Sequence, residues 1–254
     1  MLCRGLPFEP RTGKTGRDQP PRRSHAVRTA PSVIVFDVNE TLSDMSPLAD
    51  RFAEAGAPAS LAKLWFATLL RDGFALTAVG DNSAFAEIGA EALRGLLAGM
   101  DLTMEADAAV EHIMQGMAGL ELHPDVPDGV SALKEAGYRL ATLTNGSADI
   151  AENLFNAAGI RDSFDLLLSV DDAPAWKPAR GAYDFAAAAC GTDPEQMLLV
   201  AVHPWDIHGA ARAGLGTAWI NRSGAPYPAY FAEPDYTVTS LPELARTLTG
   251  VQSD

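Results

Sequence analysis

Short apolar runs recur along the chain from residue 32 onward, and each ends in polar residues. The first run is Val33–Phe36, which is rich in β-branched side chains and is followed at once by Asp37. Runs of the same kind follow at 138–144, 165–170, 197–202 and 217–220. Because these runs are continuously apolar rather than alternating, they predict strands that are buried on both faces of a parallel sheet.

Helical patterns fill the intervals between the predicted strands. They cover 129–136, 148–158, 181–189 and 207–213. A glycine stands just past three of them, where helices commonly stop, at Gly137, Gly159 and Gly214. Alternating strands and helices with short connections predict a doubly wound, Rossmann-like α/β fold with a parallel sheet. In such sheets ligands bind beyond the carboxyl ends of the strands, so the polar residues there form the candidate site.

Residues 45–126 break this alternation, because they carry helical patterns and no convincing strand. Ser60 is a suitable N-cap for one helix. The apolar stripe of that helix is expected at helical spacing on Leu61, Leu64, Trp65, Thr68 and Leu69. Phe66 and Leu70 form a second apolar face of the same helix. We expect 45–126 to form an inserted all-helical cap over the strand ends, while 32–44 and 127–250 form the α/β core.

Composition and charge narrow the function classes. Apolar residues make up 47% of the 254 residues and charged residues 20%, as in ordinary globular proteins. The formal net charge is −14, which argues against a nucleic-acid partner and against an anionic membrane surface. Two cysteines are too few for a disulfide scaffold and favour a reducing, cytoplasmic setting. No stretch of about 18 apolar residues is present, so no membrane span is expected.

Residues 1–31 differ from the rest of the chain. They hold seven Lys and Arg against two Asp and Glu, which leaves a net charge of −19 for residues 32–254. They also contain five prolines and almost no apolar periodicity. Such a segment cannot bury enough surface to offset the entropy of chain ordering, so we expect a disordered basic tail.

Side chains that could take part in catalysis or in ligand binding follow four of the predicted strands. Asp37 ends the first strand, and Thr144 with Asn145 ends the second. Lys177 lies in the loop after the third strand, and His203 and Asp206 follow the fourth. We expect these tips to converge at one edge of the sheet. A carboxylate there can be a nucleophile if a lysine keeps it ionised, while hydroxyl and amide groups orient it and bind substrate oxygens.

These residues belong to four motifs that resemble the motifs of a known superfamily. The motifs are Phe36-Asp37-x-x-x-Thr41-Leu42, Thr144-Asn145-Gly146, Lys177-Pro178 and Trp205-Asp206. In this order and spacing the chain resembles the haloacid dehalogenase superfamily over roughly residues 32–245. Within it, the chain is most similar to the L-2-haloacid dehalogenases. It shares with them the all-helical cap, the pattern from Lys177 to Tyr183 and the pattern from Trp205 to Ala210.

The resemblance implies a hydrolase that displaces the leaving group of a small 2-substituted carboxylic acid. The strand-one aspartate attacks the carbon that bears the halogen, and water then hydrolyses the aspartyl ester. It implies catalytic roles for Asp37, Thr41, Lys177 and Asp206, and substrate-binding roles for Thr144, Asn145, Tyr183 and Trp205. We add His203 to the expected catalytic residues for the chemistry of its imidazole, and Phe66 to the expected substrate-binding residues because its apolar face can line the cavity. No metal and no other cofactor is expected, and a homodimer is left open.

The chain departs from the resembled family at two places. The family carries an arginine after Leu-Trp that binds the leaving halide, whereas Phe66 follows Leu64-Trp65 here. The family has Ser-x-Asn before Trp-Asp, whereas Ala201 and His203 occupy those positions here. Imidazole titrates near neutral pH, so we expect His203, oriented or charge-balanced by Asp206, to help activate the hydrolytic water.

Two other functions stay open at this point. A phosphatase of the same superfamily usually needs an acid two residues after the nucleophile, where this chain has Asn39. It also needs Mg²⁺ held by several carboxylates, and only Asp206 stands in the fourth motif. A binding protein without catalysis is the other alternative. It is motivated by Phe66 and Ala201, and it is opposed by the intact Asp37, Lys177 and Asp206.

Several candidate residues also fit purely structural roles. Thr41 can cap a turn, Asn145-Gly146 is a common turn pair, and Lys177 can be a solvated loop residue. Core packing would account for Tyr183 and Phe66, and a backbone hydrogen bond would account for His203.

Overall fold

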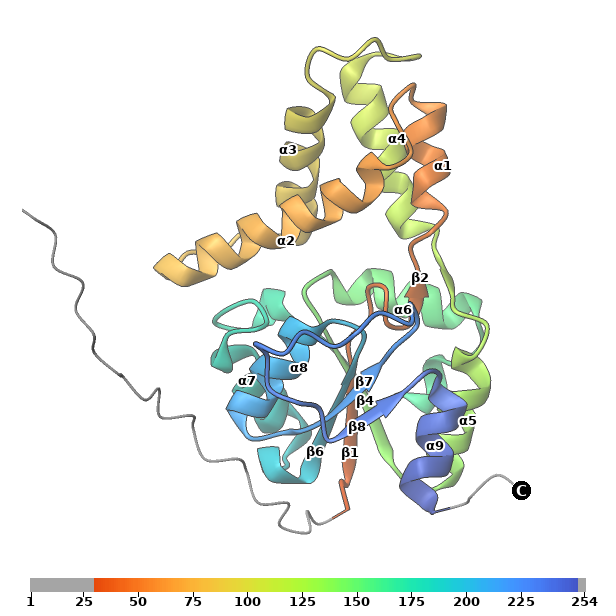
Figure 1. The fold of residues 1–254 in the computed structure, drawn as a ribbon, viewed down its shortest axis with the longest axis vertical. Coiled ribbons are helices and arrows are strands. Elements are labelled where there is room, and N and C mark those ends of the chain that lie inside the picture. Colours follow the sequence, from red (N-terminus) through yellow and green to blue (C-terminus); the bar gives the residue numbers. More distant parts are fainter. Residues whose placement is uncertain (1–29, 251–254) are drawn as a thin grey trace, which may run out of the picture.

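A six-stranded parallel sheet forms the centre of the molecule (Figure 1). The computed structural model describes residues 30–250. The strand order is β5-β4-β1-β6-β7-β8, and every neighbouring pair runs parallel. The strands are β1 Val33–Phe36, β4 Arg139–Thr144, β5 Leu166–Ser169, β6 Met197–Ala201, β7 Gly216–Ile220 and β8 Tyr236–Val238. The predicted doubly wound α/β fold is therefore confirmed. The short strand β8 was not among the predicted strands.

Helices cover both faces of the sheet, which explains the continuous apolar runs. Val33 and Val35 of β1 point into one apolar core with the buried sides of α7 and α8. Ile34 and Phe36 point into the other core with α5, α6 and α9. The helices are α5 Val126–Glu135, α6 Ala148–Ala157, α7 Arg180–Cys190, α8 Pro204–Ala213 and α9 Leu241–Thr249. Single 3₁₀ turns lie at Arg161–Ser163, Val170–Asp172 and Pro194–Gln196.

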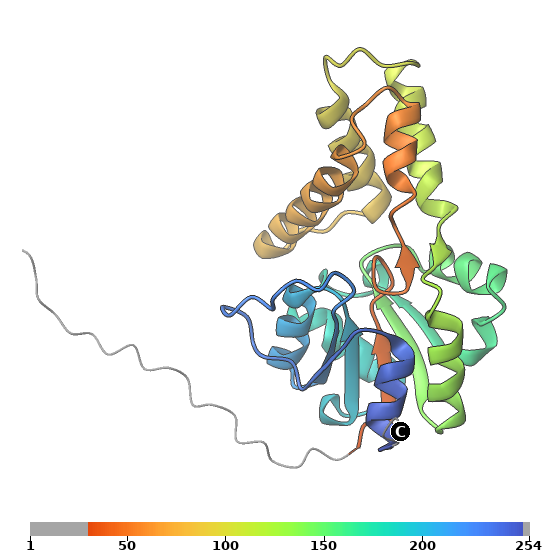
Figure 2. The ribbon, with the colours of Figure 1, turned by 45° about the vertical axis from the view of Figure 1, so that its right-hand side comes forward.

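Four helices stand together above the carboxyl ends of the strands (Figure 2). They are α1 Leu48–Glu54, α2 Leu61–Val79, α3 Phe85–Leu97 and α4 Ala106–Ala118. Two short antiparallel strands, β2 Ser43–Asp44 and β3 Glu121–Leu122, pair where the chain leaves the core and returns to it. The expectation of no strand within 45–126 is therefore wrong at β3. A two-residue strand leaves no periodic signal for a sequence pattern to detect.

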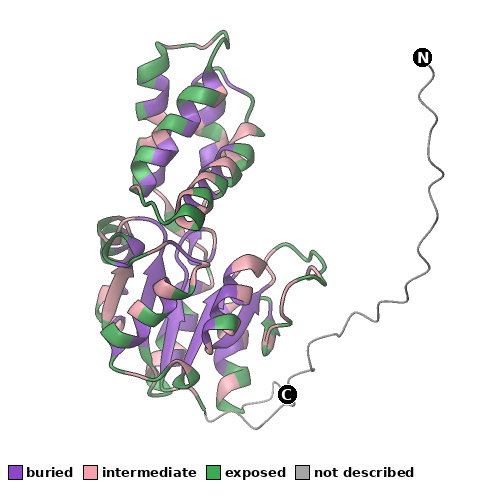
Figure 3. Ribbon diagram, turned by 90° about the vertical axis from the view of Figure 1, so that its left-hand side faces the viewer, coloured by how far each residue is buried: buried purple, intermediate pink, exposed green. Residues whose placement is uncertain are grey.

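The buried face of α2 differs from the predicted stripe. Leu64 is 51% exposed, whereas Trp65 and Leu69 are buried as expected. Phe66 and Leu70 of the predicted second face are buried as well. The reason is that α2 packs against α3 on one side and faces the core on another, so its interior arc is rotated. Ser60 makes no side-chain capping bond, because its backbone is itself helical. Figure 3 shows the buried cap interior between exposed outer surfaces.

A loop of the core is inserted into the cap. Trp176, in the loop after β5, is 1% exposed and lies against Gly73 of α2. Its ring stacks on Phe85 of α3 at a centroid distance of 6.1 Å. Its backbone N–H donates to the Thr77 hydroxyl at 3.2 Å. The next residue is Lys177, so the loop that carries this lysine is fixed by the cap as well as by the core.

Two predictions can be checked only for the residues that the structure describes. The basic tail expected at 1–31 lies outside them except for its last two positions. Among the helices of residues 30–250, none combines the length and the apolar character that crossing a bilayer requires.

Candidate active site

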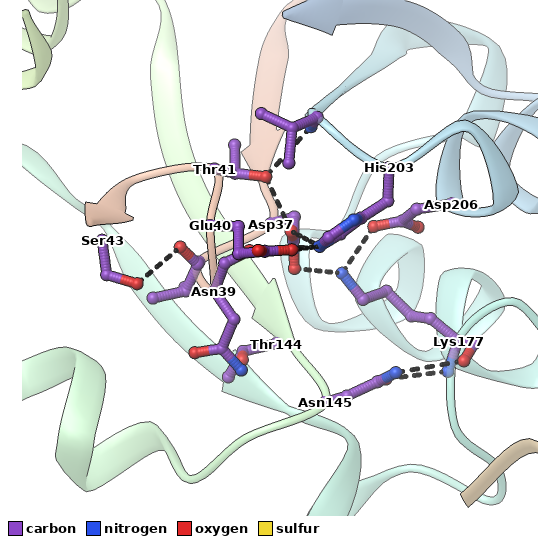
Figure 4. A network of polar contacts seen from close by, with 12 residues as sticks. Asp37, Asn39, Glu40, Thr41, Ser43, Thr144, Asn145, Lys177, His203 and Asp206 are labelled. Atoms are coloured by element: carbon purple, nitrogen blue, oxygen red, sulfur yellow. Dashed lines mark hydrogen bonds and ion pairs between the residues drawn. The ribbon is translucent and has the colours of Figure 1, made fainter. Parts of the chain in front are cut away.

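Three charged side chains from separate strand tips meet above β1 (Figure 4). Asp37 directly follows β1, Lys177 follows β5, and Asp206 lies in the first turn of α8 after β6. The Lys177 Nζ donates to Asp37 Oδ1 at 2.9 Å and to Asp206 Oδ2 at 2.7 Å. The side chains of Lys177 and Asp206 are fully buried, and that of Asp37 is 5% exposed. The predicted convergence of these three residues is what the parallel topology produces.

Burial and the neighbouring charges shift the pKa of Lys177 in opposite directions. Burial alone lowers the pKa of Lys177, but the attraction of Asp206 and Asp37 outweighs it and raises the pKa above its ordinary value. Burial raises the pKa of the Asp206 carboxyl, an effect that Lys177 opposes. Lys177 is therefore a cation at neutral pH, held between two carboxylates and shielded from solvent.

Thr41 orients the second oxygen of Asp37. Its hydroxyl donates to Asp37 Oδ2 at 2.7 Å and accepts from the Val202 N–H at 3.1 Å. The backbone N–H bond fixes the hydroxyl, so its hydrogen is left to point at the carboxylate. Each oxygen of Asp37 thus has one strong donor.

Thr144 and Asn145, for which substrate contacts are predicted, both make hydrogen bonds within the protein. The Asn145 amide forms two hydrogen bonds with the backbone of Lys177, donating to its carbonyl at 3.1 Å and accepting from its N–H at 3.0 Å. The Thr144 hydroxyl accepts from the Gly146 N–H at 2.9 Å. Both residues are buried. Their role is to hold the turn after β4 and the Lys177 loop together.

Tyr183, another predicted substrate contact, supports Asp206. Its hydroxyl donates to Asp206 Oδ1 at 2.6 Å, and its side chain is fully buried. Burial raises the pKa of Tyr183 well above its ordinary value, so the hydroxyl keeps its proton. The close approach of α7 to α8 requires Gly209, where a Cβ would lie 2.5 Å from that hydroxyl. Both Asp206 oxygens are consequently occupied, one by Lys177 and one by Tyr183.

His203 faces Asp37, and its partners differ from those expected. Its Nε2 lies 3.3 Å from the Asn39 carbonyl, 3.7 Å from Asp37 Oδ2 and 3.6 Å from Glu40 Oε2. A carbonyl only accepts, so the proton of the ring resides on Nε2. No hydrogen bond or ion pair joins His203 to Asp206 in the described part of the chain. The expectation that Asp206 orients His203 is therefore wrong, since both Asp206 oxygens are taken.

Aromatic rings surround His203 on the side of the cap. Trp205 stacks on the imidazole with ring centroids 4.9 Å apart and planes at 15°. Phe66 of α2 lies 6.1 Å from the imidazole. Phe66, His203 and Glu40 line a pocket of about 850 Å³ between cap and core, together with Lys63 and Arg222. Phe66 thus borders the pocket as predicted, whereas Trp205 is linked to it through His203.

The charged groups above β1 are paired with one another. Within residues 30–250 no three His, Cys, Asp or Glu side chains are grouped to hold a metal ion. The Lys177 ammonium occupies the space between the Asp37 and Asp206 carboxylates, where it bonds to both. A divalent cation between them would meet this buried positive charge.

A sequence model of the haloacid dehalogenase-like hydrolases matches residues 31–214, which is most of the chain. The chain belongs to this family. This haloacid dehalogenase-like hydrolase is 33% identical over 210 residues to an (S)-2-haloacid dehalogenase of Pseudomonas sp. strain YL, covering 82% of this chain and 90% of that protein. It is 31% identical to haloacetate dehalogenase H-2 of Moraxella sp. strain B, covering 81% of this chain and 92% of that protein.

The fold of this hydrolase also agrees with a solved relative. The L-2-haloacid dehalogenase of Xanthobacter autotrophicus superimposes with a TM-score of 0.78 at 26% identity. The match covers 87% of this chain and all of that protein.

Glu40, like Lys63 and Arg222, lines the pocket between cap and core and was not singled out by the sequence pattern. It has φ 61, and no other non-glycine residue of the described chain has a positive φ. The available signal was a charged residue in the turn directly before Thr41.

Proposed function

We propose that this hydrolase removes the halogen from a small 2-halogenated carboxylic acid by forming an ester on Asp37. The observation that carries the proposal is the Asp37 carboxylate at the tip of β1, with Lys177 on one oxygen and Thr41 on the other. The Lys177 cation lies beside this buried carboxylate and supplies the opposite charge that suits an anionic nucleophile. The names of the two bacterial relatives, which denote 2-haloacid and haloacetate dehalogenases, support the same substrate class.

The first step is a displacement at carbon. One oxygen of Asp37 forms a bond to C2 of the substrate, and the carbon–halogen bond breaks with its electron pair leaving on the halide. The carboxylate loses its negative charge as the ester forms. In the second step water adds to the ester carbonyl carbon of Asp37, and the bond to the substrate oxygen breaks. The products are a 2-hydroxy acid, a halide ion and a proton.

The proposal includes metal independence. Displacement at carbon needs one ionised carboxylate, and Lys177 supplies the positive charge beside it. Asn39, two residues after Asp37, has no acidic proton to give to a phosphate leaving group. The chemistry of this site is therefore suited to a halide, which leaves without a proton.

Halide release tests the proposal. The protein is incubated with (S)-2-chloropropionate or chloroacetate, with and without EDTA, and separately with p-nitrophenyl phosphate and Mg²⁺. We expect halide release that EDTA leaves unchanged and that Asp37→Asn abolishes. The matched control is Asp184→Asn, which changes an exposed carboxylate paired with Arg180 on α7.

The opposite pattern refutes the proposal. No halide from any short 2-chloro, 2-bromo or 2-fluoro acid, together with Mg²⁺-dependent release of p-nitrophenol, would assign the site to phosphate esters.

A further inference from the structure

The backbone of Glu40 has a conformation that is unfavourable for a residue with a side chain. A φ of 61 lies in the left-handed region, which residues with a Cβ enter at an energetic cost and which recurs at functional sites. The side chain of Glu40 is 42% exposed and lines the pocket between cap and core. Its carboxylate lies 3.6 Å from His203 Nε2, which in turn lies 3.7 Å from Asp37 Oδ2. Glu40 is thus an exposed carboxylate one side chain away from the nucleophile.

The other groups around Asp37 turn hydrogen-bond donors, or oxygens that are already bonded, toward it. Asp206 is fully buried, and its two oxygens bond to Lys177 and Tyr183. Lys177 is a protonated donor to both carboxylates. His203 presents the N–H of its Nε2 to Asp37 and Glu40, because the Asn39 carbonyl beside that nitrogen can only accept. Glu40 is the carboxylate at this site that combines solvent access with a free acceptor oxygen.

We propose that Glu40 accepts the proton of the water that hydrolyses the Asp37 ester, and that His203 is a positioning residue for it. This inference rests on the proposed function, because it needs an ester on Asp37. The His203 N–H faces two carboxylates in the free enzyme. Once Asp37 is esterified its charge is gone, and the N–H is left facing the Glu40 carboxylate. The nucleophile and the base are therefore linked through one imidazole.

The step balances as follows. Water oxygen bonds to the carbonyl carbon of the Asp37 ester, and one water proton passes to a Glu40 oxygen. The tetrahedral adduct then collapses and breaks the bond between that carbon and the substrate oxygen. The departing alkoxide takes the proton from Glu40 and leaves as the hydroxyl of the 2-hydroxy acid. The second water proton ionises from the regenerated Asp37 carboxyl, and Glu40 is again a carboxylate.

Glu40→Gln tests the proposal, because it keeps the shape of the side chain and removes its basicity. The variant is mixed with excess chloroacetate, halide is followed in time, and the intact protein is weighed by mass spectrometry. We expect one equivalent of halide in a burst, followed by turnover slowed ~100-fold or more, as for loss of a general base. The Asp37 ester should accumulate as a mass increase of one carboxymethyl group.

A second variant separates the carboxylate from the backbone strain. Glu40→Gly accepts the left-handed backbone without strain and lacks the base. We expect it to accumulate the same ester, and we expect added formate to speed its breakdown by replacing the missing carboxylate. The matched control is Glu54→Gln, which breaks a Glu–His pair of similar type with His112 on the cap surface and should leave the burst and the turnover unchanged.

The role of His203 is tested by comparing the rate of ester breakdown in two variants. His203→Gln keeps an N–H donor near Glu40 and should break down the ester faster than His203→Ala, with the rate of the burst alike in the two variants. Equal breakdown rates in the two variants would overturn the positioning role.

The outcomes separate this inference from the proposed function. Normal turnover of Glu40→Gln without an adduct overturns the role of Glu40 alone, as does an adduct in Glu40→Gly that formate leaves unchanged. The absence of any halide burst and adduct in the wild-type protein and all variants overturns the ester, and with it both proposals.

Discussion

Replacing Lys177 by Met should destabilise the protein strongly, and the loss should depend on pH. Methionine is close to lysine in length, so the change removes the charge while it leaves little void. It leaves Asp37 and Asp206 facing each other without the cation that separates them. Their side chains are 5% and 0% exposed, so solvent cannot take over the role of Lys177.

The size of the effect follows from the two bonds that are lost. Each of the Lys177 bonds, at 2.9 and 2.7 Å, is a hydrogen bond between charged groups, worth about 1.5–3 kcal/mol net. Removing one partner of a buried ion pair costs about 3–5 kcal/mol, and we expect the variant to fall in that range at pH 7. A domain of this kind is stable by about 5–15 kcal/mol, so the variant is expected to remain folded but close to its limit.

The sign of the pH dependence comes from the Asp206 carboxyl. Burial and the charge of Asp37 raise the pKa of Asp206, and without Lys177 only the hydrogen bond from Tyr183 opposes that rise. A group with a raised pKa in the folded state binds a proton more readily there than in the unfolded chain. The variant therefore loses stability as the pH rises from about 4, the ordinary carboxyl range, and the deficit against the wild type is smaller in acid.

Urea unfolding at a series of pH values measures this effect. We expect Lys177→Met to unfold at a much lower urea concentration than the wild type at pH 7. At about pH 4–5 the two unfolding concentrations should lie closer together. Adding Asp206→Asn to Lys177→Met should recover part of the loss, because one of the two facing charges is gone. A deficit below about 1 kcal/mol that is the same at every pH would refute the reasoning, since surface pairs behave that way.

Two further changes test the packing of Trp176 and the partly buried ion pair between Arg222 and Asp125. Gly73→Ala places a methyl group against the Trp176 ring and should cost about 1–3 kcal/mol in urea unfolding, whereas Gly95→Ala, with open space around it in α3, should be neutral or stabilising. Burial alone raises the pKa of Asp125, but Arg222 and the backbone N–H of Leu241 together outweigh it, and the pKa lies below its ordinary value. Asp125→Asn should therefore lose stability at neutral pH. That loss should fade as the pH falls through and below the ordinary carboxyl range, and a loss that persists in acid would contradict the ion-pair account.

The sequence predicts an element of the fold correctly where the local pattern of apolar residues agrees with the packing of that element in the structure. Val33–Phe36 is apolar at every position because it lies at the centre of a sheet covered on both faces, and that pattern needs no knowledge of its neighbours. β8 has only three residues, with two of them partly or fully exposed, so it lacks this pattern and was missed. Leu64 fits an apolar stripe by spacing, yet it faces outward because tertiary packing decides which arc of α2 is buried.

The site could be predicted as a set of residues but not as a set of bonds. The order of the motifs placed Asp37, Lys177 and Asp206 at one edge of the sheet, since parallel strands end together. Which polar atom satisfies which neighbour depends on distances that no spacing encodes. For this reason the sequence did not predict the hydrogen bond from Tyr183 to Asp206 or the one from Asn145 to the Lys177 loop.

The origin of the oxygen atoms in a single turnover tests the central claim most directly. The enzyme is mixed in excess with (S)-2-chloropropionate in H₂¹⁸O, and the Asp37 peptide and the product are weighed by mass spectrometry. The account predicts that the ¹⁸O enters the Asp37 carboxylate and that the first 2-hydroxy acid carries unlabelled oxygen from that side chain. Labelled 2-hydroxy acid with an unlabelled Asp37 would mean direct attack of water on the substrate and would contradict the aspartyl ester.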